Sequence, residues 1–403
     1  MKTYHYVIVG GGMTAAAAIQ GIREVDPDGS IGMFGAEEDP PYDRPPLSKG
    51  IWKGKALESI WRNMDHRAVT THLGCTIKEI LPEHKRVVDD HGEFFGYKKL
   101  LLATGSLPRR FAFGDDQIIY FRTIADYRRL RGLTAAGQKF AVIGGGFIGA
   151  EIAAALTADG KKVVMLFPGK NIGARIFPPE LSEFVSAYYR QKGVEIIAGE
   201  SVTASYARGG QNVLRTASDR EIVADGIVAG IGVQPNIALA RSIGLEIEDG
   251  VVVDELLRTN RPDIYAAGDV AAFYSPLLQQ RRRVEHEDNA NVMGRQAGRN
   301  MAGRKEPYRY LPFFYSDLFD LGYEAVGQVD AGLEMVEDWQ RPNEEGVIYY
   351  LKNQRVRGVL LWNVWGQLDA ARELMAQLGP FNRENLIGRI GHPATVHAAK
   401  ANR

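Results

Sequence analysis

Residues 6–18 read Tyr-Val-Ile-Val-Gly-Gly-Gly-Met-Thr-Ala-Ala-Ala-Ala, and residues 140–155 read Phe-Ala-Val-Ile-Gly-Gly-Gly-Phe-Ile-Gly-Ala-Glu-Ile-Ala-Ala-Ala. In each stretch a short apolar run, typical of a buried parallel strand, leads through glycines into an alanine-rich segment that favours helix. A second apolar run follows each segment, at residues 30–34 and 162–167. Strand, glycine turn, helix and strand make a dinucleotide-binding unit, and this sequence contains two.

The spacing of the glycines has a physical reason. The first permits a tight turn, the second lets backbone N–H groups approach a pyrophosphate, and the third must be small so that the helix packs on the strand. These three places are held by Gly10, Gly12 and Ala15 in the first copy and by Gly144, Gly146 and Gly149 in the second. One such motif is a weak signal, but two in the same context predict two bound nucleotides.

A second pair of similar stretches repeats at nearly the same distance. Leu-Leu-Ala-Thr-Gly-Ser-Leu-Pro-Arg at residues 101–109 resembles Ile-Val-Ala-Gly-Ile-Gly-Val-Gln-Pro-Asn at residues 227–236. The glycine loops lie 134 residues apart and the prolines of this second pair 127 apart. The similar spacing indicates two domains of one architecture.

Composition narrows the function classes. The 403 residues favour two or three domains, and 49 basic side chains balance 49 acidic ones, which argues against a dedicated nucleic-acid or membrane-surface protein. The single cysteine, Cys75, allows no internal disulfide and lies in an apparent strand, where packing is expected. The eight histidines lack metal-ligand spacing, so no metal site is expected. With neither a signal peptide nor a run of eighteen apolar residues, the cytoplasm is the expected location and no membrane contact is predicted.

The chain resembles the FAD-dependent ferredoxin and rubredoxin reductases, and within that group proteins like apoptosis-inducing factor. The resemblance extends from residue 6 to about residue 370. Beyond the glycine loops, the matching stretches are Pro41-Tyr-Asp-Arg-Pro-Pro-Leu-Ser-Lys49, Ala103-Thr-Gly105, Gly230-Ile-Gly-Val-Gln-Pro-Asn236, Ile264-Tyr-Ala-Ala-Gly-Asp269, Val284-Glu-His-Glu-Asp-Asn-Ala290, Pro312-Phe-Phe-Tyr-Ser-Asp317 and Gly322-Tyr-Glu-Ala-Val-Gly327.

The fold that this resemblance implies is α/β, with two Rossmann-like dinucleotide-binding domains. An FAD domain of residues 1–110 and 237–315 would be interrupted by an NAD(P) domain of residues 111–236. A small α/β C-terminal domain would follow at residues 316–403. The expected cofactors are therefore FAD and NAD(P)H.

Glu151 is the most informative acid. It lies inside an apolar stretch, where an unpaired carboxylate is costly, so a cationic partner is expected. The resemblance supplies Lys49 and implies that the two act as catalytic residues beside the flavin N5, where the hydride arrives. The alternative is a structural ion pair elsewhere.

Other residues are implied to contact FAD. Asp269 matches an aspartate that binds the ribityl chain, although a strand-end aspartate also caps helices. Arg44 and Lys49 are implied to lie near the phosphates and the flavin, or else they are solvated surface. Glu37 is expected to bind the adenosine ribose, with Glu38 as the alternative. The remaining cofactor-binding positions are Thr14, Ala103, Thr104, Gly105, Phe147, Ile148, Gly232, Gly268, Glu285, His286 and Tyr315.

Three positions depart from the family pattern. Tyr315 replaces the tryptophan with which many relatives cover the isoalloxazine, and Glu287 stands where an aromatic residue or a histidine is common. Phe167 occupies the place of the ribose-binding glutamate of the nicotinamide domain. These departures put fast turnover with NADH in doubt, but not the fold.

The expected function is hydride transfer from NAD(P)H to FAD, followed by electron transfer to an iron–sulfur protein of the ferredoxin kind. The alternative is a redox-sensing interaction flavoprotein with slow NADH turnover. A disulfide reductase or cysteine-dependent oxidase is excluded, because residues 40–50 contain no cysteine. Arg281, Arg282 and Arg283 form either a solvated loop or a face for an acidic carrier, and the chain is expected to be a monomer or homodimer.

Overall fold

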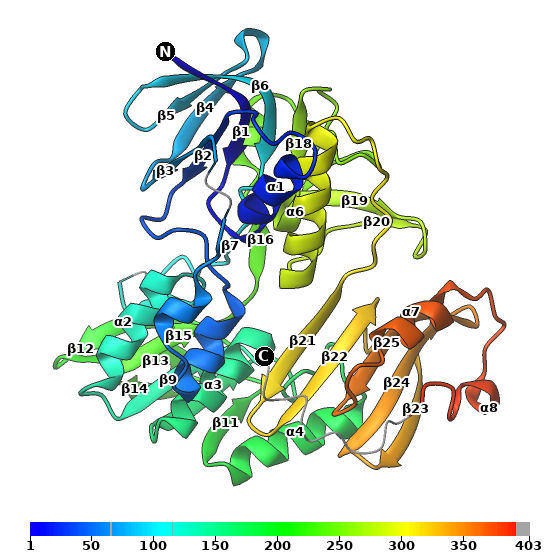
Figure 1. The fold of residues 1–403 in the computed structure, drawn as a ribbon. Helices are drawn as coiled ribbons and strands as arrows, with labels where there is room; N and C mark the ends of the chain where they lie inside the picture. The colour runs from blue at the N-terminus through cyan, green and yellow to red at the C-terminus, as the bar shows by residue number, and fades with distance from the viewer. Residues whose placement is uncertain (65–66, 115, 392–403) are drawn as a thin grey trace. The chain divides into compact units, whose positions relative to one another are not determined.

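The computed structural model describes residues 1–64, 67–114 and 116–391, which form two compact units (Figure 1). The first unit contains Met1–Arg44, Leu57–Leu107 and Gln234–Pro312. The second contains Pro45–Ala56, Pro108–Val233 and the chain from Phe313 onward. The three-domain boundaries expected from the sequence stay a prediction, and residues 392–403 of the expected C-terminal domain lie outside the described residues.

The first unit is built on a parallel sheet that an antiparallel hairpin extends. Its strand order is β3 (Val69–Leu73), β2 (Ile31–Gly35), β1 (Lys2–Val9), β6 (Phe94–Leu102), β5 (Arg86–Asp89) and β4 (Ile77–Leu81), with β18 (Ile264–Ala266) paired to the end of β6. Strands β3, β2, β1, β6 and β18 run parallel to one another, whereas β5 pairs antiparallel with β6 and β4 pairs antiparallel with β5. Its smaller elements include α5 (Ala238–Ser242), β17 (Val251–Val252), β19 (Ala271–Ser275), β20 (Gln280–Arg282) and the 3-10 helices η3 (Leu57–Ile60), η4 (Pro82–His84) and η5 (Gly268–Val270).

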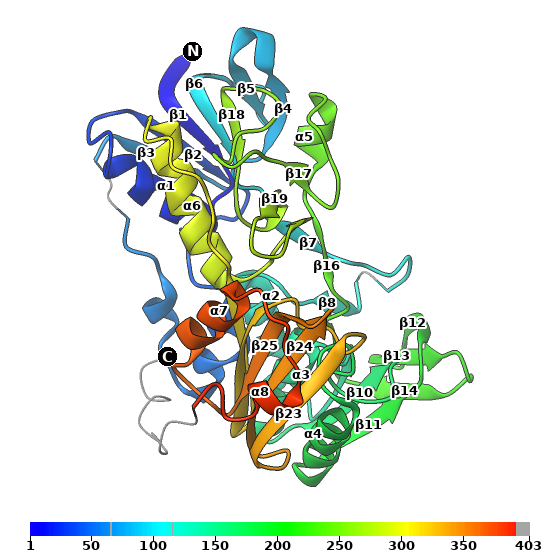
Figure 2. The ribbon, with the colours of Figure 1, turned by 90° about the vertical axis from the view of Figure 1, so that its right-hand side faces the viewer.

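Two helices of the first unit pack backbone against backbone. Helices α1 (Met13–Arg23) and α6 (Glu287–Met301) lie side by side in Figures 1 and 2. A Cβ added to Gly21 would stand 2.0 Å from the carbonyl oxygen of Arg295, and one added to Gly298 would stand 2.1 Å from that of Ala18. Glycine therefore sets the distance between these helices, and any larger side chain would separate them.

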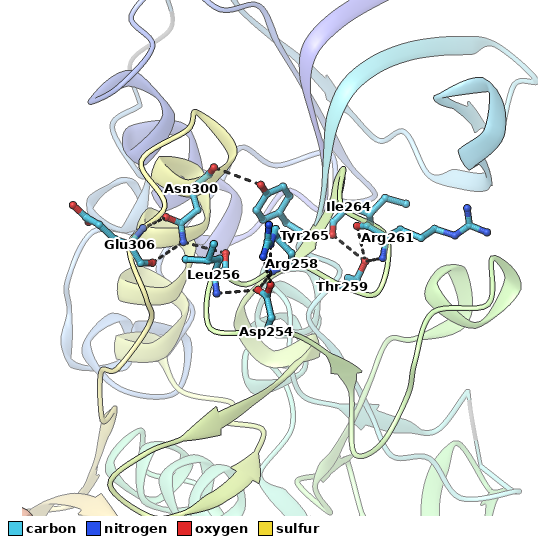
Figure 3. A network of polar contacts seen from close by, with 9 residues as sticks. All are labelled: Asp254, Leu256, Arg258, Thr259, Arg261, Ile264, Tyr265, Asn300 and Glu306. Carbon is cyan, nitrogen blue, oxygen red and sulfur yellow. Dashed lines mark hydrogen bonds and ion pairs between the residues drawn. The ribbon is translucent and has the colours of Figure 1, made fainter.

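Polar contacts fix the segment that leads into β18 (Figure 3). Asp254 accepts hydrogen bonds from the backbone N–H groups of Leu256 and Arg258, each 2.9 Å long, and forms an ion pair with Arg258. Asn300, near the end of α6, donates to the carbonyl oxygen of Leu256 at 3.0 Å. The segment is thus tied to α6 before it enters β18 and reaches Asp269.

The second unit repeats the parallel arrangement. Its sheet has the order β11 (Val194–Ala198), β10 (Lys162–Phe167), β9 (Lys139–Ile143), β15 (Gly226–Ala229) and β8 (Ile118–Tyr120), all parallel. Its helices include α2 (Ile124–Thr134), α3 (Phe147–Ala158) and α4 (Pro179–Gln191), and β12 (Val202–Arg208), β13 (Gln211–Thr216) and β14 (Glu221–Ala224) form a separate antiparallel sheet. The chain passes between the units in β7 (Ser106–Pro108) and β16 (Val233–Pro235), and η1 (Pro45–Ser48) and η2 (Gly50–Lys53) also belong to the second unit.

The C-terminal part of this unit is an antiparallel sheet with helices α7 (Leu368–Ala376) and α8 (Arg383–Leu386) (Figure 2). Its strand order is β21 (Phe313–Leu318), β22 (Leu321–Gly327), β25 (Arg355–Trp362), β24 (Glu345–Lys352) and β23 (Glu334–Arg341). The predicted fold class, two Rossmann-like sheets and a small α/β part, is confirmed. Within the described residues, no helix combines the length and apolar character needed to cross a membrane.

Candidate functional site

The first glycine loop joins β1 to α1. Gly10 has a φ of +132°, and a Cβ there would lie 2.1 Å from the carbonyl oxygen of Ala103, so the fold itself requires glycine. A Cβ on Gly12, in contrast, would meet no described atom within 4 Å. Ala15 is fully buried, which explains why the third position must stay small. Of the three positions, the middle glycine is the one that borders open space.

The second glycine loop has the same division of roles. Gly144 has a φ of +119°, and a Cβ on it would lie 2.3 Å from the carbonyl oxygen of Gly230. A Cβ on Gly149 would lie 2.0 Å from the carbonyl oxygen of Gly144, so the third position of this copy does not tolerate alanine. A Cβ on Gly146 would meet no described atom within 4 Å. Here too the middle glycine leaves space beside the start of a helix.

The helix starts at these two loops suit an anion. Gly12 is the N-cap of α1 and Gly146 the N-cap of α3, and neither helix has a side-chain cap hydrogen bond among the described residues. Helix α2, by comparison, begins with a capping box made by Thr123 and Asp126. Because unsatisfied N–H groups and the helix dipole favour negative charge, the glycine caps fit the pyrophosphates of two dinucleotides.

Glu37 and Arg44 form a polar cluster after β2. The Arg44 guanidinium lies 2.5 Å from Glu37 Oε1, and the Tyr42 hydroxyl donates to Glu37 Oε2 at 2.6 Å. Burial lowers the pKa of Arg44, but the neighbouring Tyr42 and Glu37 outweigh it and leave that pKa raised. The cation is therefore permanent, and the structure brings together two residues that the sequence considered separately.

Asp269 lies at the end of β18, buried in η5. Its carboxylate accepts a 2.7 Å hydrogen bond from Ser106. Gly268 before it has a φ of +76°, and a Cβ there would lie 2.2 Å from the Thr14 hydroxyl of α1. Thr104 is tied to the same region by a 2.8 Å hydrogen bond to the carbonyl oxygen of Asn236. The ends of β6 and β18 and the start of α1 thus meet at one edge of the sheet, where doubly wound folds bind ligands. Ala103 and Gly105 flank Thr104 after β6.

Residues before α6 carry several charges. Arg283 forms ion pairs with Glu285 and Asp249, and Arg281 forms one with Glu248. His286 follows as the N-cap of α6. Arg281 and Arg282 lie in β20, and the Arg283 side chain is only 8% exposed, so this run is not the solvated loop that was one of the two expectations. Its role as a face for an acidic carrier stays a prediction.

Lys49 and Glu151 are brought together in the second unit. The ammonium nitrogen of Lys49 lies 2.7 Å from Glu151 Oε1, and the side chains are 12% and 2% exposed. Glu151 projects from α3, and Lys49 lies between η1 and η2. The isolated acid in the apolar helix therefore has the cationic partner that burial demands.

Two serines complete the surroundings of Glu151, and sequence reasoning did not single them out. Ser48 donates to Glu151 Oε2 and Ser316 donates to Glu151 Oε1, both at 2.6 Å. Burial, followed by the charge of Glu151, raises the pKa of Tyr189 and of Tyr323 well above the ordinary value, so both phenols stay neutral. The only available sequence signal was adjacency, since Ser48 precedes Lys49 and Ser316 follows Tyr315.

Tyr315 belongs to the same cluster. It lies on β21, and the Lys49 ammonium stands 5.1 Å from the centre of its ring, within the range of a cation–π contact. Phe147 and Ile148, at the start of α3, are 36% and 38% exposed. Large apolar side chains that remain exposed beside an open helix start suit a flat ring. Gly232 has a φ of +96° and its carbonyl oxygen accepts from the N–H of Arg109.

Phe167 was expected to stand where relatives carry a ribose-binding acid, and that assignment stays a prediction. Phe167 ends β10 with 3% exposure, and its ring would lie 2.9 Å from a Cβ on Gly145 of the glycine loop.

Cys75 is packed in the core of the first unit. Burial and the nearby Asp89 raise the pKa of its thiol to about 11, so it stays protonated at neutral pH.

The comparisons with known proteins agree with this geometry. The model of the pyridine nucleotide-disulphide oxidoreductases matches residues 4–294, and that of the mitochondrion-associated C-terminal part of apoptosis-inducing factor matches residues 297–345 and 338–377. Mitochondrial apoptosis-inducing factor 1 of Dictyostelium discoideum is 33% identical, over 93% of this chain and 79% of that protein. The ferredoxin–NAD(+) reductase component of the anthranilate 1,2-dioxygenase system of Burkholderia cepacia is also 33% identical, over 93% and 95%.

Among solved structures, the crystal structure of the covalent putidaredoxin reductase–putidaredoxin complex contains a similar chain. The TM-score is 0.86 at 28% sequence identity, and the match covers 93% of this chain and 94% of that chain. The resemblance inferred from the sequence motifs is therefore confirmed.

Proposed function

Because the chain belongs to the pyridine nucleotide-disulphide oxidoreductase family, we propose that it passes a hydride from NAD(P)H to FAD and then electrons to a small iron–sulfur protein of the ferredoxin kind. The broader activity, that of an NAD(P)H-dependent flavoprotein reductase with FAD as its cofactor, follows from the family itself. The observation that carries the proposal is the pair of helices that begin at open glycines, one in each unit.

In the first unit, the proposed roles follow the contacts. Gly10 shapes the turn and Gly12 leaves room for the pyrophosphate of FAD at the start of α1. Glu37 would accept hydrogen bonds from the adenosine ribose while Arg44 neutralises the phosphates. Asp269, oriented by Ser106, would bind the ribityl chain. When bound, FAD supplies a hydride acceptor at N5 and the ability to release electrons one at a time.

In the second unit, the loop from Gly144 to Gly149 would hold the nicotinamide nucleotide at the start of α3, with Phe147, Ile148 and Gly232 beside it. Lys49 and Glu151 would act as the catalytic pair by holding one fixed positive charge close to the flavin. A charge that is already in place costs no reorganisation when electron density builds on the flavin. The pair neither gives nor takes a proton in this scheme.

Stopped-flow reduction tests the proposal. NADH and NADPH are mixed separately with the FAD-loaded protein, and bleaching of the flavin is followed before a small [2Fe–2S] ferredoxin is added. Reduction by a nicotinamide nucleotide and rapid reoxidation by the ferredoxin are expected. Reduction followed by reoxidation that is no faster than with oxygen alone would contradict the iron–sulfur acceptor.

A second candidate is a redox-sensing interaction flavoprotein similar to apoptosis-inducing factor. Two observations favour it. Residues 297–345 and 338–377 match the model of the C-terminal part of apoptosis-inducing factor, and position 167 carries phenylalanine in place of an acid. The same experiment separates the two functions, because a sensor would form a long-lived reduced complex with the nucleotide. A change in the hydrodynamic radius of that complex would give it further support.

Replacing Tyr315 with Trp should alter the flavin spectrum. The larger indole ring strengthens the cation–π contact with Lys49. If residue 315 lies against the flavin, the indole also enlarges the stacked surface, and such aromatic pairs contribute about 0.5–1.5 kcal/mol beyond area burial. The expected result is a shifted visible absorption band and stronger quenching of flavin fluorescence. The matched control is Tyr206→Trp, at a tyrosine on β12 of the same unit. Identical spectra for both variants would place Tyr315 away from the flavin.

Replacing Phe167 with Glu should tighten NADH binding. A carboxylate at the end of β10 can accept hydrogen bonds from ribose hydroxyls, and such a charged hydrogen bond is worth about 1.5–3 kcal/mol, or roughly 10- to 150-fold in affinity. The native protein, without that acid, should bind both nucleotides weakly and discriminate little between them. Titration of NADH and NADPH by flavin reduction or calorimetry measures this.

The control for this prediction is Phe167→Gln, which keeps the length of Glu but cannot repel the 2′-phosphate of NADPH. Glu should therefore favour NADH over NADPH more than Gln does. If the native protein already rejects NADPH by a hundredfold, another acid performs the discrimination and the role assigned to this position is wrong.

A further inference from the structure

Three donors from two chain segments, the adjacent Ser48 and Lys49 and the distant Ser316, converge on the Glu151 carboxylate. Lys49 and Ser316 both bind Oε1, at 2.7 and 2.6 Å, and Ser48 binds Oε2 at 2.6 Å. Ser48 comes from η1, Ser316 from β21 and the acceptor from α3. Chain segments 103 and 165 residues apart from the acceptor are thus joined at one side chain.

We propose that Ser48 and Ser316 are positioning residues that clamp the Glu151 carboxylate, so that it holds the Lys49 ammonium at one point against Tyr315. The proposal rests on the proposed function, in which Lys49 acts on the flavin. It extends that function to two residues whose hydroxyl groups donate to Glu151 and, in this scheme, do not contact the cofactor.

The distribution of the hydrogen bonds carries the inference. A carboxylate that accepts only at one oxygen can still rotate about its Cγ–Cδ bond and carry its cation with it. Ser48 fixes the second oxygen and removes that rotation, while Ser316 shares Oε1 with Lys49 and fixes the direction from which the ammonium approaches. Three of about four acceptor positions on the carboxylate are thereby occupied.

Burial makes the clamp effective. Ser48 is 4% exposed, Ser316 is not exposed and Glu151 is 2% exposed, so water competes little for these bonds. Hydrogen bonds to a charged group are short and strong, and both serine bonds have the expected length. Without them, the remaining partner, Lys49, would have to fix the carboxylate alone through a flexible four-carbon side chain.

Alanine variants test the proposal in the FAD-loaded protein. Ser48→Ala and Ser316→Ala should each lower the limiting rate of flavin reduction by NADH about 10-fold, the loss of one charged hydrogen bond. The apparent Kd for NADH should change less than about twofold on the same scale. The flavin reduction potential, measured by equilibration with a dye, should become more negative because the positive charge that stabilises reduced flavin is less well placed.

The matched control is Ser186→Ala. Ser186 is equally buried in the same unit, but its hydroxyl donates to a backbone carbonyl oxygen, that of Ser182. Ser48→Thr, which keeps the hydroxyl, should restore the native potential. The proposal is refuted if Ser48→Ala and Ser316→Ala change the flavin reduction potential and the rate of flavin reduction no more than Ser186→Ala does.

The two proposals fail in different ways. If NADH does not reduce the native flavin, the proposed function fails, while the dye-measured potential still tests the serines. If an alanine variant retains no FAD, a double-mutant cycle of unfolding with Ser316→Ala and Glu151→Gln in the apoprotein decides. Coupling between the two supports the clamp, and strict additivity refutes it.

Discussion

Replacing Lys49 with Met is expected to lower the free energy of unfolding by about 3 kcal/mol, the lower end of the roughly 3–5 kcal/mol typical of a broken buried ion pair. The change leaves the Glu151 carboxylate charged and 2% exposed. Ser48 and Ser316 still donate to it, which is why the upper end of the range is not expected. Urea unfolding of the apoprotein measures the loss without a contribution from bound FAD.

The partner variant should cost less. Glu151→Gln keeps the size of the side chain and removes the charge, and the Lys49 side chain, 12% exposed, retains some access to water. In the double variant Lys49→Met/Glu151→Gln neither charge is left without its partner. Its loss should therefore be smaller than the sum of the single losses, by about 1 kcal/mol or more.

An exposed pair of the same length provides the control. Lys192 and Asp320 also lie 2.7 Å apart in the second unit, but their side chains are 37% and 77% exposed. Exposed pairs contribute about 0.2–1 kcal/mol, so the cycle Lys192→Met/Asp320→Asn should show little coupling. Equal coupling in the two pairs, or none in either, would mean that burial does not set the strength of the Lys49–Glu151 interaction.

The parts of the site that sequence could predict are those coded locally. The two glycine loops were found because strand, turn and helix follow one another within about twenty residues, and each glycine has its own local reason. Lys162–Phe167 was predicted as a strand and is β10 with the same bounds. The end of β25 is less visible in the sequence: the strand stops at Trp362 because Asn363 adopts a φ of +52° that ends the ladder.

The parts that sequence could not predict depend on long-range contacts. No pattern in residues 41–49 shows that Ser48 donates to a carboxylate 103 residues away, and the same holds for Ser316 at 165 residues. Nor does the sequence show that Pro45–Ala56 belongs to the second unit, although the residues before and after this segment belong to the first. A partner for Glu151 was required by burial alone, but which residues supply it is a property of the folded chain.

Gly12→Val is expected to remove most of the bound FAD while leaving the apoprotein folded. The backbone at Gly12 has φ −99° and ψ −164°, a conformation that valine adopts, and a Cβ there meets no described atom within 4 Å. Valine is a poor N-cap, so a loss of about 1 kcal/mol in stability is expected. The branched side chain would, however, fill the space through which a pyrophosphate reaches the first N–H groups of α1.

Gly10→Ala is the variant that separates a ligand effect from a folding effect. Its Cβ would lie 2.1 Å from the carbonyl oxygen of Ala103, and its φ of +132° disfavours any side chain, so this variant should destabilise the apoprotein itself. FAD content by absorbance and apoprotein stability by urea unfolding are measured for both. Gly12→Val should lower the FAD content and leave the free energy of unfolding nearly unchanged. Gly10→Ala should lower the free energy of unfolding of the apoprotein. A Gly12→Val variant that retains its full flavin would show that the pyrophosphate does not approach α1 at this glycine, and the first glycine loop would then lose its assigned role.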